Sequence, residues 1–361
     1  MLVNHLELFA GIGGFRRALD LLCKDFGIES NSIGFSEIEQ NAVNTYKSNF
    51  DTSNEIEIGD IVAFASEKSK IDSLANFEML SGGFPCQSFS MMGKQKGFND
   101  MRGNVFFQIL EIAKRKKPQI ILLENVKNIL THNKGKTFEV IIDSIKEIGY
   151  EYVYYDVFNT LNFSLPQNRN RVFIFASKTK LPEDFLFKSA VISTEFDKIK
   201  NRTSLIKYNY TYEILEKDVE DKYFLSEIIK PTILADGSKN FKSNSSIDQL
   251  IARPLTATMA KMHRACQDNY FSTDFINSDN PIEYSKLTFT KEELAKKQIR
   301  RITPKEAFML QGFSEEFFEK AKGIGTSDSQ LYKQAGNAVS VNTVYAILYY
   351  LIVVKKILGG F

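Results

Sequence analysis

Cysteine and histidine are scarce in this 361-residue sequence, with three of each, and tryptophan is absent. The cysteines (Cys23, Cys86 and Cys266) lie far apart and form no C-x-x-C pair. This spacing excludes a disulfide framework and a Cys/His zinc site. We therefore expect no metal site and a reducing compartment.

Strong net charge and long apolar runs are also lacking. The formal net charge is +2, so the overall charge is not the electrostatic footprint of a nucleic-acid-binding domain. No stretch reaches the roughly 18 apolar residues of a spanning helix, and no basic segment precedes an apolar run at the N-terminus. The sequence predicts a soluble, cytoplasmic protein without a membrane partner, whose apolar end, 340–358, is a buried helix.

One segment departs from this balance of charge. Between Gly93 and Pro118 there are seven Lys or Arg residues against two acidic ones. Such runs are usually solvated helix faces, and we interpret Lys114–Lys117 in that way.

The first half of the chain alternates short apolar runs with helical patterns. This alternation is typical of repeated βα units around a mostly parallel sheet and predicts the α/β class. Apolar residues at helical spacing, such as Phe15, Leu19, Leu22, Cys23 and Phe26, place Cys23 on a buried stripe. The predicted strands are 5–10, 32–37, 55–60, 77–82, 119–125, 151–159 and 171–177.

The alternation stops near residue 178, and the chain becomes irregular and rich in Asn, Ser, Asp and Lys. Regular patterning returns near residue 299. We expect a first domain made of residues 1–177 and 330–361, a smaller second domain over 178–298, and a hinge and return segment over 299–329.

Ligands of open α/β sheets bind outside the carboxyl ends of the strands. The first predicted strand ends in "FAGIGGF" (9–15), which is not a dinucleotide fingerprint because Arg16 occupies the third glycine position. Glu37 ends the second strand, where an acid can accept ribose hydroxyls, and Asp60 ends the third, where it can accept an amine such as adenine N6. Together they predict a nucleoside pocket without a phosphate-binding device.

The fourth and fifth predicted strands end near Cys86 and Glu124. A lone cysteine in a turn is more often a small buried residue. A thiol and a carboxyl at neighbouring strand ends instead favour a nucleophile and an acid, provided that the surroundings stabilise the thiolate.

An ordered series of motifs resembles the DNA (cytosine-5) methyltransferases of bacterial or phage restriction-modification type, which use S-adenosyl-L-methionine. The resemblance implies a Rossmann-like S-adenosylmethionine-dependent methyltransferase fold with a mixed, mostly parallel sheet and a smaller, irregular target-recognition domain at 178–298. The motifs are "LFAGIGGF" (8–15), "GFPCQSFS" (83–90), "ENV" (124–126), "QNRNRV" (167–172), "RRITPKEAFMLQGF" (300–313) and "QAGNAVSVNT" (334–343).

The resemblance implies a catalytic role for each of five residues. Cys86 would add to C6 of a cytosine so that C5 can attack the methyl group. Glu124 would hold or protonate N3, and Asn125 would fix the loop. Arg171 would bond O2, with Arg169 near the same site.

The resemblance also implies a binding site for S-adenosyl-L-methionine. Ile38 stands where the family often has Trp, so an aliphatic contact would replace stacking on adenine. The implied cofactor residues are Phe9, Gly11, Ile12, Gly13, Gly14, Glu37, Ile38, Asp60, Ile61, Phe84, Pro85, Val105, Asn337 and Val339.

The substrate implied is double-stranded DNA, from which the target base must be flipped out of the stack. "MMGKQKGFNDMRGN" (91–104) resembles the family's mobile catalytic loop, and "RPLTATMAKMHR" (253–264) resembles a recognition segment. The implied DNA-binding residues are Gln87, Ser90, Lys94, Lys96, Arg102, Arg253, Lys261 and Arg264. We expect a monomer that pairs in function with a restriction endonuclease without forming a stable complex with it.

Three alternatives are weaker. A tRNA cytosine-5 methyltransferase of the same fold typically carries a Cys-Phe-Thr tripeptide, which does not occur here. A catalytically idle DNA-binding relative would not need Cys86, Glu124 and Arg171 together. A nicotinamide-dependent oxidoreductase would explain the βα units but not the Pro-Cys-Gln motif.

Overall fold

The computed structural model describes residues 1–85, 105–238, 241–242, 245–261 and 263–359. The chain divides into two compact units. Unit 1 consists of Met1–Asn159, Asn170–Leu205 and Val339–Phe361, and unit 2 of Thr160–Arg169 and Ile206–Ala338. Residues 178–205 thus belong to unit 1, and the ten-residue segment Thr160–Arg169 belongs to unit 2.

Unit 1 contains a seven-stranded sheet in the order β3-β2-β1-β4-β5-β7-β6. β1 to β5 pair in parallel, whereas β7 is antiparallel to both β5 and β6. This confirms the predicted α/β class and the mixed, mostly parallel sheet. The strands are β1 (Leu2–Leu8), β2 (Glu29–Ser36), β3 (Ile56–Glu57), β4 (Met79–Gly83), β5 (Ile120–Val126), β6 (Tyr152–Asn159) and β7 (Asn170–Ser177).

All seven strands expected in this half of the chain are present, but β3 is much shorter than the predicted 55–60. Gly59 has a φ of +63°, which is the left-handed region and ends extended backbone. Residues 58–60 therefore form the turn into the next helix.

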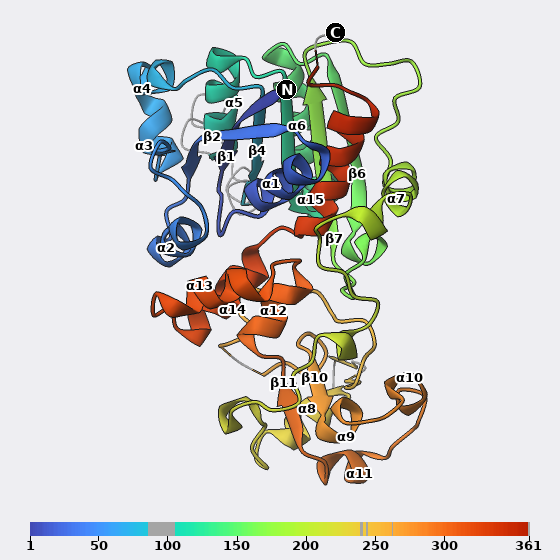
Figure 1. Cartoon of the computed structure of the whole chain (residues 1–361). Coiled ribbons are helices and arrows are strands. Elements are labelled where there is room, and N and C mark those ends of the chain that lie inside the picture. The colour runs from blue at the N-terminus through green and yellow to red at the C-terminus, as the bar shows by residue number, and fades with distance from the viewer. Residues whose placement is uncertain (86–104, 239–240, 243–244, 262, 360–361) are drawn as a thin grey trace. The chain divides into compact units, whose positions relative to one another are not determined.

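Helices cover both faces of this sheet (Figure 1). α1 packs against α15, and α15 against α7, while α3 to α6 contribute to the apolar core on the other face. The helices of unit 1 are α1 (Gly14–Phe26), α2 (Gln40–Asn49), α3 (Ile61–Ser66), α4 (Lys68–Ser73), α5 (Val105–Lys116), α6 (Lys136–Glu147), α7 (Ser189–Asp197) and α15 (Val341–Leu348).

The predicted apolar stripe of α1 is buried except at its end, where Phe26 is 37% exposed. Cys23 lies in this stripe, and burial raises the pKa of its thiol to about 11. A thiol with so high a pKa is a poor nucleophile near neutral pH, which agrees with the predicted structural role.

The apolar C-terminal region is also buried, as predicted. Every residue of α15 is buried, and a π-helical turn, Tyr349–Val354, follows it directly. Within the described part of the chain, Asp328–Val354 is long and apolar enough to cross a membrane, but 78% of the apolar window is buried inside the protein.

Unit 2 is built from short elements joined by irregular chain. Its two small sheets pair β8 (Gly237–Ser238) with β9 (Phe241–Lys242) and β10 (Tyr270–Ser272) with β11 (Ile299–Arg301). Its helices are α8 (Lys230–Leu234), α9 (Thr273–Ile276), α10 (Pro281–Tyr284), α11 (Lys291–Ala295), α12 (Pro304–Leu310), α13 (Glu315–Gly323) and α14 (Asp328–Asn337).

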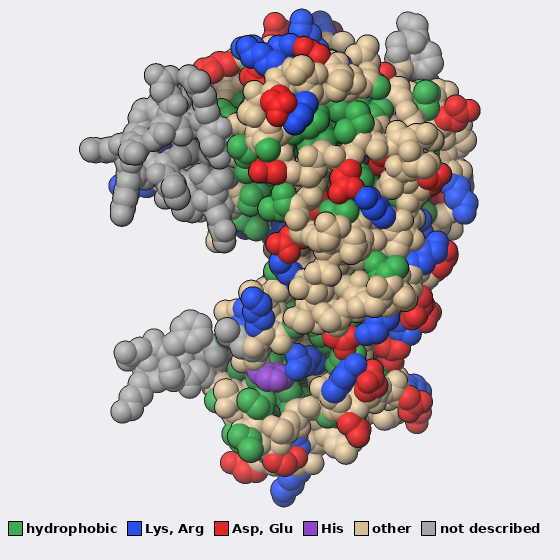
Figure 2. All heavy atoms as spheres, turned by 90° about the vertical axis from the view of Figure 1, so that its left-hand side faces the viewer, with side chains coloured by type: hydrophobic (Ala, Val, Ile, Leu, Met, Phe, Trp, Pro, Cys, Tyr) green, Lys and Arg blue, Asp and Glu red, His purple; other side chains and the backbone are tan. Residues whose placement is uncertain are grey.

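Surface charges of opposite sign are intermixed on the face shown in Figure 2. Exposed charged side chains of the described chain often pair, as Lys198 does with Glu195 at 2.7 Å and Lys286 with Glu283 at 2.5 Å. Exposed pairs of this kind contribute about 0–1 kcal/mol each, so they do not determine the fold.

Two glycines close to the C-terminal ends of unit 2 helices differ sharply in their surroundings. A Cβ at Gly336 in α14 would overlap the backbone of Thr256 and Ala257, whereas a Cβ at Gly323 in α13 would meet nothing within 4 Å. Gly336 is therefore a point of close backbone approach inside unit 2.

We predict opposite effects of alanine at these two positions. Gly336→Ala should destabilise unit 2 by about 1–3 kcal/mol because backbone atoms cannot move aside as side chains do. Gly323→Ala, the matched control, should be neutral or stabilising by up to about 1 kcal/mol because alanine favours helix. Urea unfolding of both variants measures the difference, and equal effects would show that the close approach costs nothing.

Glu7 explains how α1 begins after a glycine turn. The residue preceding the helix is Gly13, which supplies no side-chain cap. The buried Glu7 carboxyl group, on β1, instead accepts the backbone N–H groups of Phe15 and Arg16 at 3.1 and 3.2 Å. Burial raises the pKa of Glu7 to about 8, and burial lowers the pKa of nearby His5 to about 3.

These two pKa shifts predict a pH dependence that Glu7→Gln should remove. From about pH 4.5 to 8 the folded chain keeps a proton on Glu7 that the unfolded chain has lost, so raising the pH lowers the free energy of unfolding. His5 has the opposite effect, but only below about pH 6.5. Between pH 6.5 and 8, wild type should lose stability relative to Glu7→Gln, by at most about 1.4 kcal/mol per pH unit. The free energy of unfolding of both proteins is measured by urea unfolding at several pH values in this range. If it changes with pH by the same amount in both, the prediction is wrong.

Candidate active site

The sheet of unit 1 has a topological switch point between β1 and β4. From β1 the chain proceeds to β2 and β3 on one side, and β4 and β5 lie on the other. Ligands of open α/β sheets bind at the carboxyl ends of the strands flanking such a point. The predicted glycine turn follows β1, and Pro85, the first residue of the Pro-Cys-Gln motif, follows β4.

The glycine turn after β1 has a tightly constrained backbone. Phe9, Gly11 and Gly13 have φ values of +53°, +56° and +84°, and the Gly13 N–H donates to the Ala10 carbonyl at 2.8 Å. A Cβ at Gly11 would meet no atom within 4 Å. The turn is therefore open at Gly11, where a ligand can approach the backbone.

The other side of the turn is closed by packing. A Cβ at Gly13 would overlap the rings of Phe50 and Tyr46, and one at Gly14 would overlap Val339. Val339 was predicted to contribute to the cofactor site, and the structure places it against this turn. Ile12 is buried, so its side chain is part of the core.

Glu37, at the end of β2, is held beside the turn by three backbone N–H groups. One carboxylate oxygen accepts from Gly11 at 2.9 Å, and the other accepts from Ile38 and Glu39 at 2.8 Å each. The carboxylate is thus fixed next to the open position at Gly11. A carboxylate held in this way suits the two hydroxyls of a ribose.

Asp60 follows β3 and begins α3. One carboxylate oxygen accepts the Val62 N–H at 2.8 Å, and among the described residues the other oxygen has no hydrogen-bond partner. Ile61, also predicted to contact the cofactor, is buried in the core. Ile38, in contrast, is 73% exposed, so its aliphatic side chain is accessible to a ligand.

These features fit an adenosine-containing cofactor. The open backbone at Gly11, the fixed Glu37 carboxylate and the available Asp60 oxygen lie on three consecutive βα connections of one sheet.

Phe84 adds a buried apolar side chain after β4, where its ring centroid lies 5.3 Å from that of Phe106. Val105 is half-buried against the same core, and Pro85 is exposed. Asn337, the last predicted cofactor residue, is exposed at the end of α14 in unit 2.

Glu124 and Arg171 form an ion pair at the edge of the sheet where β5 ends. Arg171 Nε lies 2.9 Å from Glu124 Oε1, and both side chains are mostly buried. Because β7 is antiparallel to β5, its first residues meet the last residues of β5, with Arg171 opposite Val126. A carboxyl and a guanidinium predicted from separate motifs therefore lie together.

Asn125 connects the ends of β4 and β5. Its side-chain amide donates to the Phe84 carbonyl at 2.8 Å and its oxygen accepts the Val126 N–H at 2.8 Å. The residue before Pro85 is thereby tied to the strand that carries Glu124. This contact agrees with a loop-fixing role for Asn125.

Six predicted residues lie outside the described part of the chain: Cys86, Gln87, Ser90, Lys94, Lys96 and Arg102. Their roles stay predictions. Phe84 and Pro85 are the described residues that lead into this segment, at the end of β4.

Arg169 has a clear structural environment in unit 2. It is only 2% exposed, and its guanidinium donates to the carbonyls of Leu255, Gly336 and Ala338 at 2.8, 3.1 and 2.9 Å. Gln167, two residues earlier, donates to the Leu310 carbonyl and accepts the Leu255 N–H. The predicted role of Arg169 toward the base stays a prediction, whereas its contacts stabilise unit 2.

Two of the three predicted recognition cations have partners inside unit 2. Arg253 donates to the backbone carbonyls of Asp268 and Ser246 at 3.1 and 2.8 Å, and Arg264 pairs with Asp268 at 3.0 Å. Lys261 is exposed. Arg253 and Arg264 therefore hold the shape of the segment 253–264, and the predicted DNA contacts of both stay predictions.

The sequence did not point to two residues near these features. Glu7 lies within an apolar strand, so only its burial under α1 marks it. Arg16, considered as a departure from a glycine motif, packs its guanidinium over the Phe50 ring at 4.8 Å and pairs with Glu55. Its neighbours come from α2 and the loop after it, which no local pattern indicates.

Known proteins resemble this chain over nearly its whole length. The family described as C-5 cytosine-specific DNA methylase matches residues 3–352. The type II methyltransferase M1.ScrFI of Lactococcus lactis subsp. cremoris is 36% identical over 95% of this chain and 76% of its own length. The type II methyltransferase M.SsoII of Shigella sonnei is 35% identical over 95% of this chain and 78% of its own.

A solved structure shares the fold. The Entamoeba histolytica methyltransferase EhMeth superposes with a TM-score of 0.71 at 22% identity, covering 98% of each chain. Because the family match spans most of the chain and the described site residues lie at the strand ends where a ligand binds, the chain belongs to the C-5 cytosine-specific DNA methylases and is a DNA (cytosine-5-)-methyltransferase.

Proposed function

We propose that unit 1 binds S-adenosyl-L-methionine and that Cys86, Glu124 and Arg171 methylate C5 of a cytosine flipped out of duplex DNA. The Glu124–Arg171 pair carries the proposal, because it presents an acid and a cation to one base at the edge where the Pro-Cys-Gln loop begins. When bound, the cofactor supplies an electrophilic methyl group. The chain has to make C5 of cytosine nucleophilic and to hold the base.

The Cys86 thiolate adds to C6 while Glu124 donates a proton to N3. C5 would then form its bond to the methyl carbon as the bond between that carbon and the sulfonium sulfur breaks, and the neutral thioether would leave. A base then removes the C5 proton, the C6–S bond breaks to restore the thiolate, and the N3 proton returns to Glu124. Arg171, oriented by its contact with Glu124, bonds the cytosine O2, and a fixed cation of this kind stabilises developing charge.

The cofactor would be held by groups from three strand ends. Glu37 accepts the ribose hydroxyls and Asp60 the adenine amine, while Gly11 leaves room for close approach. Ile38 would cover the adenine with an aliphatic side chain. Phe9, Phe84, Val105 and Val339 would form the apolar walls.

We further propose that residues 178–298 provide target recognition, with Gln87, Ser90, Lys94, Lys96, Arg102 and Lys261 among the DNA contacts. The two relatives named above are type II methyltransferases, which supports a role in restriction-modification. The protein would then act as a cytoplasmic monomer that protects DNA from a separate endonuclease.

Cys86→Ala should abolish methyl transfer to duplex DNA, because no thiolate remains to activate C5. Glu124→Gln keeps the shape and the contact with Arg171 but loses the acid, and the rate should fall by about 10²–10⁴-fold. Cys266→Ala, a control for loss of a thiol elsewhere, should retain activity. A labelled-methyl assay on duplex DNA and on tRNA measures all three, and transfer by Cys86→Ala or label confined to tRNA would overturn the proposal.

Binding to duplex DNA should weaken steeply with salt, and Lys94→Ala with Lys96→Ala should reduce that dependence. The slope of log K against log salt is negative, and each lost phosphate contact makes it shallower by about 0.9. Fluorescence anisotropy between about 50 and about 200 mM salt measures the slope. A double variant with the wild-type slope would show that neither lysine contacts phosphate.

A further inference from the structure

Arg300 and Arg301 are neighbours on β11 with opposite environments. Successive side chains of a strand point to opposite faces. Arg300 is fully buried, pairs with Glu306 at 2.7 Å and donates to the Glu216 carbonyl at 2.7 Å. Arg301 lies across from Tyr270 of β10 and is half-buried on the other face.

Arg301 lines a small pocket of unit 2 together with His263, Asp268, Tyr270 and Tyr332. Among the described residues, its guanidinium has neither a hydrogen-bond nor an ion-pair partner. The nearby Asp268 carboxylate is already bound, since it accepts the Arg264 backbone N–H at 3.0 Å and the Arg264 guanidinium at 3.0 Å. Arg301 is therefore a half-buried cation whose neighbouring acid is occupied.

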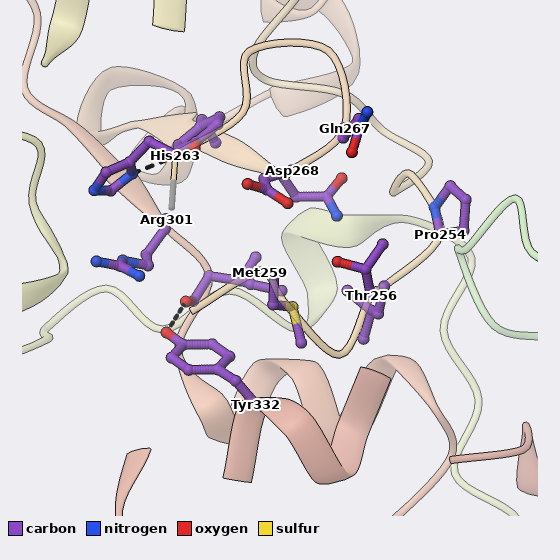
Figure 3. A pocket seen from close by; sticks show the side chains of 12 residues that line it. Pro254, Thr256, Met259, His263, Gln267, Asp268, Arg301 and Tyr332 are labelled. Atoms are coloured by element: carbon purple, nitrogen blue, oxygen red, sulfur yellow. Dashed lines mark hydrogen bonds between the residues drawn. The ribbon is translucent and has the colours of Figure 1, made fainter. Parts of the chain in front are cut away.

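His263 presents a second donor beside this cation. In Figure 3 the side chains of Arg301 and His263 point to the same side of the pocket. The Tyr270 hydroxyl accepts the Arg264 N–H at 3.2 Å and lies 3.3 Å from His263 Nδ1. The hydroxyl can donate its proton to Nδ1, and in that tautomer the ring proton of a neutral His263 lies on Nε2.

The local charge also favours an anion. Around the Asp268 carboxylate lie three guanidinium groups, those of Arg253, Arg264 and Arg301. One negative charge cannot balance three positive ones. Arg253 is engaged with backbone carbonyls and Arg264 with Asp268, so the group left to meet a ligand is Arg301.

We propose that Arg301 and His263 Nε2–H bind a phosphate of the DNA backbone. The inference rests on the proposed function and adds Arg301, which lies outside the segment 253–264 predicted for recognition, and His263, which lies inside it but was not among the predicted DNA contacts. A phosphate offsets the charge of Arg301 and accepts from both donors, whereas the edge of a base offers no net charge. The Tyr270 hydroxyl acts as a positioning group through the ring of His263.

Arg301→Ala should weaken binding to duplex DNA about tenfold, which corresponds to loss of one charged hydrogen bond. The slope of log K against log salt is negative and should become shallower by about 0.9, equally for cognate and unrelated duplexes. Arg301→Lys should restore most of the slope, because it keeps the charge. Lys286→Ala, which removes an exposed cation paired with Glu283, is the matched control and should leave the slope unchanged.

The His263 contact has its own readout. His263→Leu should weaken binding by less than Arg301→Ala, and His263→Gln, which keeps a donor, should bind more tightly than His263→Leu. The imidazole ¹⁵N spectrum distinguishes the tautomers, and Tyr270→Phe should shift it away from the Nε2–H form. A ring already protonated on Nδ1 in wild type would overturn the role of His263.

Two results would overturn the phosphate contact. One is an unchanged affinity and slope in Arg301→Ala or, where that variant does not fold, in Arg301→Gln. The other is a loss of affinity confined to the cognate sequence, which would indicate a base contact. Wild type that transfers no methyl group to any duplex would instead refute the proposed function, so the two failures are distinguishable.

Discussion

The buried guanidinium of Arg169 is the interaction on which unit 2 depends. It donates to carbonyls 86, 167 and 169 residues further along the chain. Gln311 extends the network by donating to the Ala335 carbonyl at 2.7 Å. A buried charge is expensive unless its donors are satisfied, so the segments that supply these carbonyls must fold together. The close approach at Gly336 belongs to the same region, where a side chain would separate the backbones.

The segment that contains Arg169 serves both units. Gln167 and Arg169 are committed to unit 2, whereas Arg171, two residues later, begins a strand of unit 1 and pairs with Glu124. One short motif thus combines a structural anchor with a candidate catalytic group. The antiparallel direction of β7 is essential to this arrangement, because a parallel strand would carry Arg171 to the opposite edge of the sheet.

Much of unit 1 could be predicted from local pattern. The strands follow from short apolar runs and the buried stripe of α1 from hydropathy of period three to four, and both patterns depend only on neighbouring residues. The sequence of unit 2 showed no such hydropathy pattern. The partners of the Arg253 and Arg264 guanidinium groups lie in segments without regular secondary structure, so the sequence did not indicate them. No local pattern indicated that Arg301 lacks a partner among the described residues, since this follows from the pairing of Asp268 with another arginine. Likewise, the high pKa of Glu7 reflects burial under a helix.

By itself, the sequence determined the α/β class, the order of the motifs and the residue types available for chemistry. The fold class follows from the periodicity of apolar residues, and the motifs follow from the positions of glycine, cysteine and carboxylate residues. Both are visible in short stretches of the sequence. The tertiary structure alone decided that Glu124 meets Arg171, that Glu37 is fixed beside Gly11, and which cations of unit 2 remain available to a ligand. The physical reason is that charges and hydrogen-bond donors find partners through space, across tens to hundreds of residues, and burial decides how strongly each partner is needed.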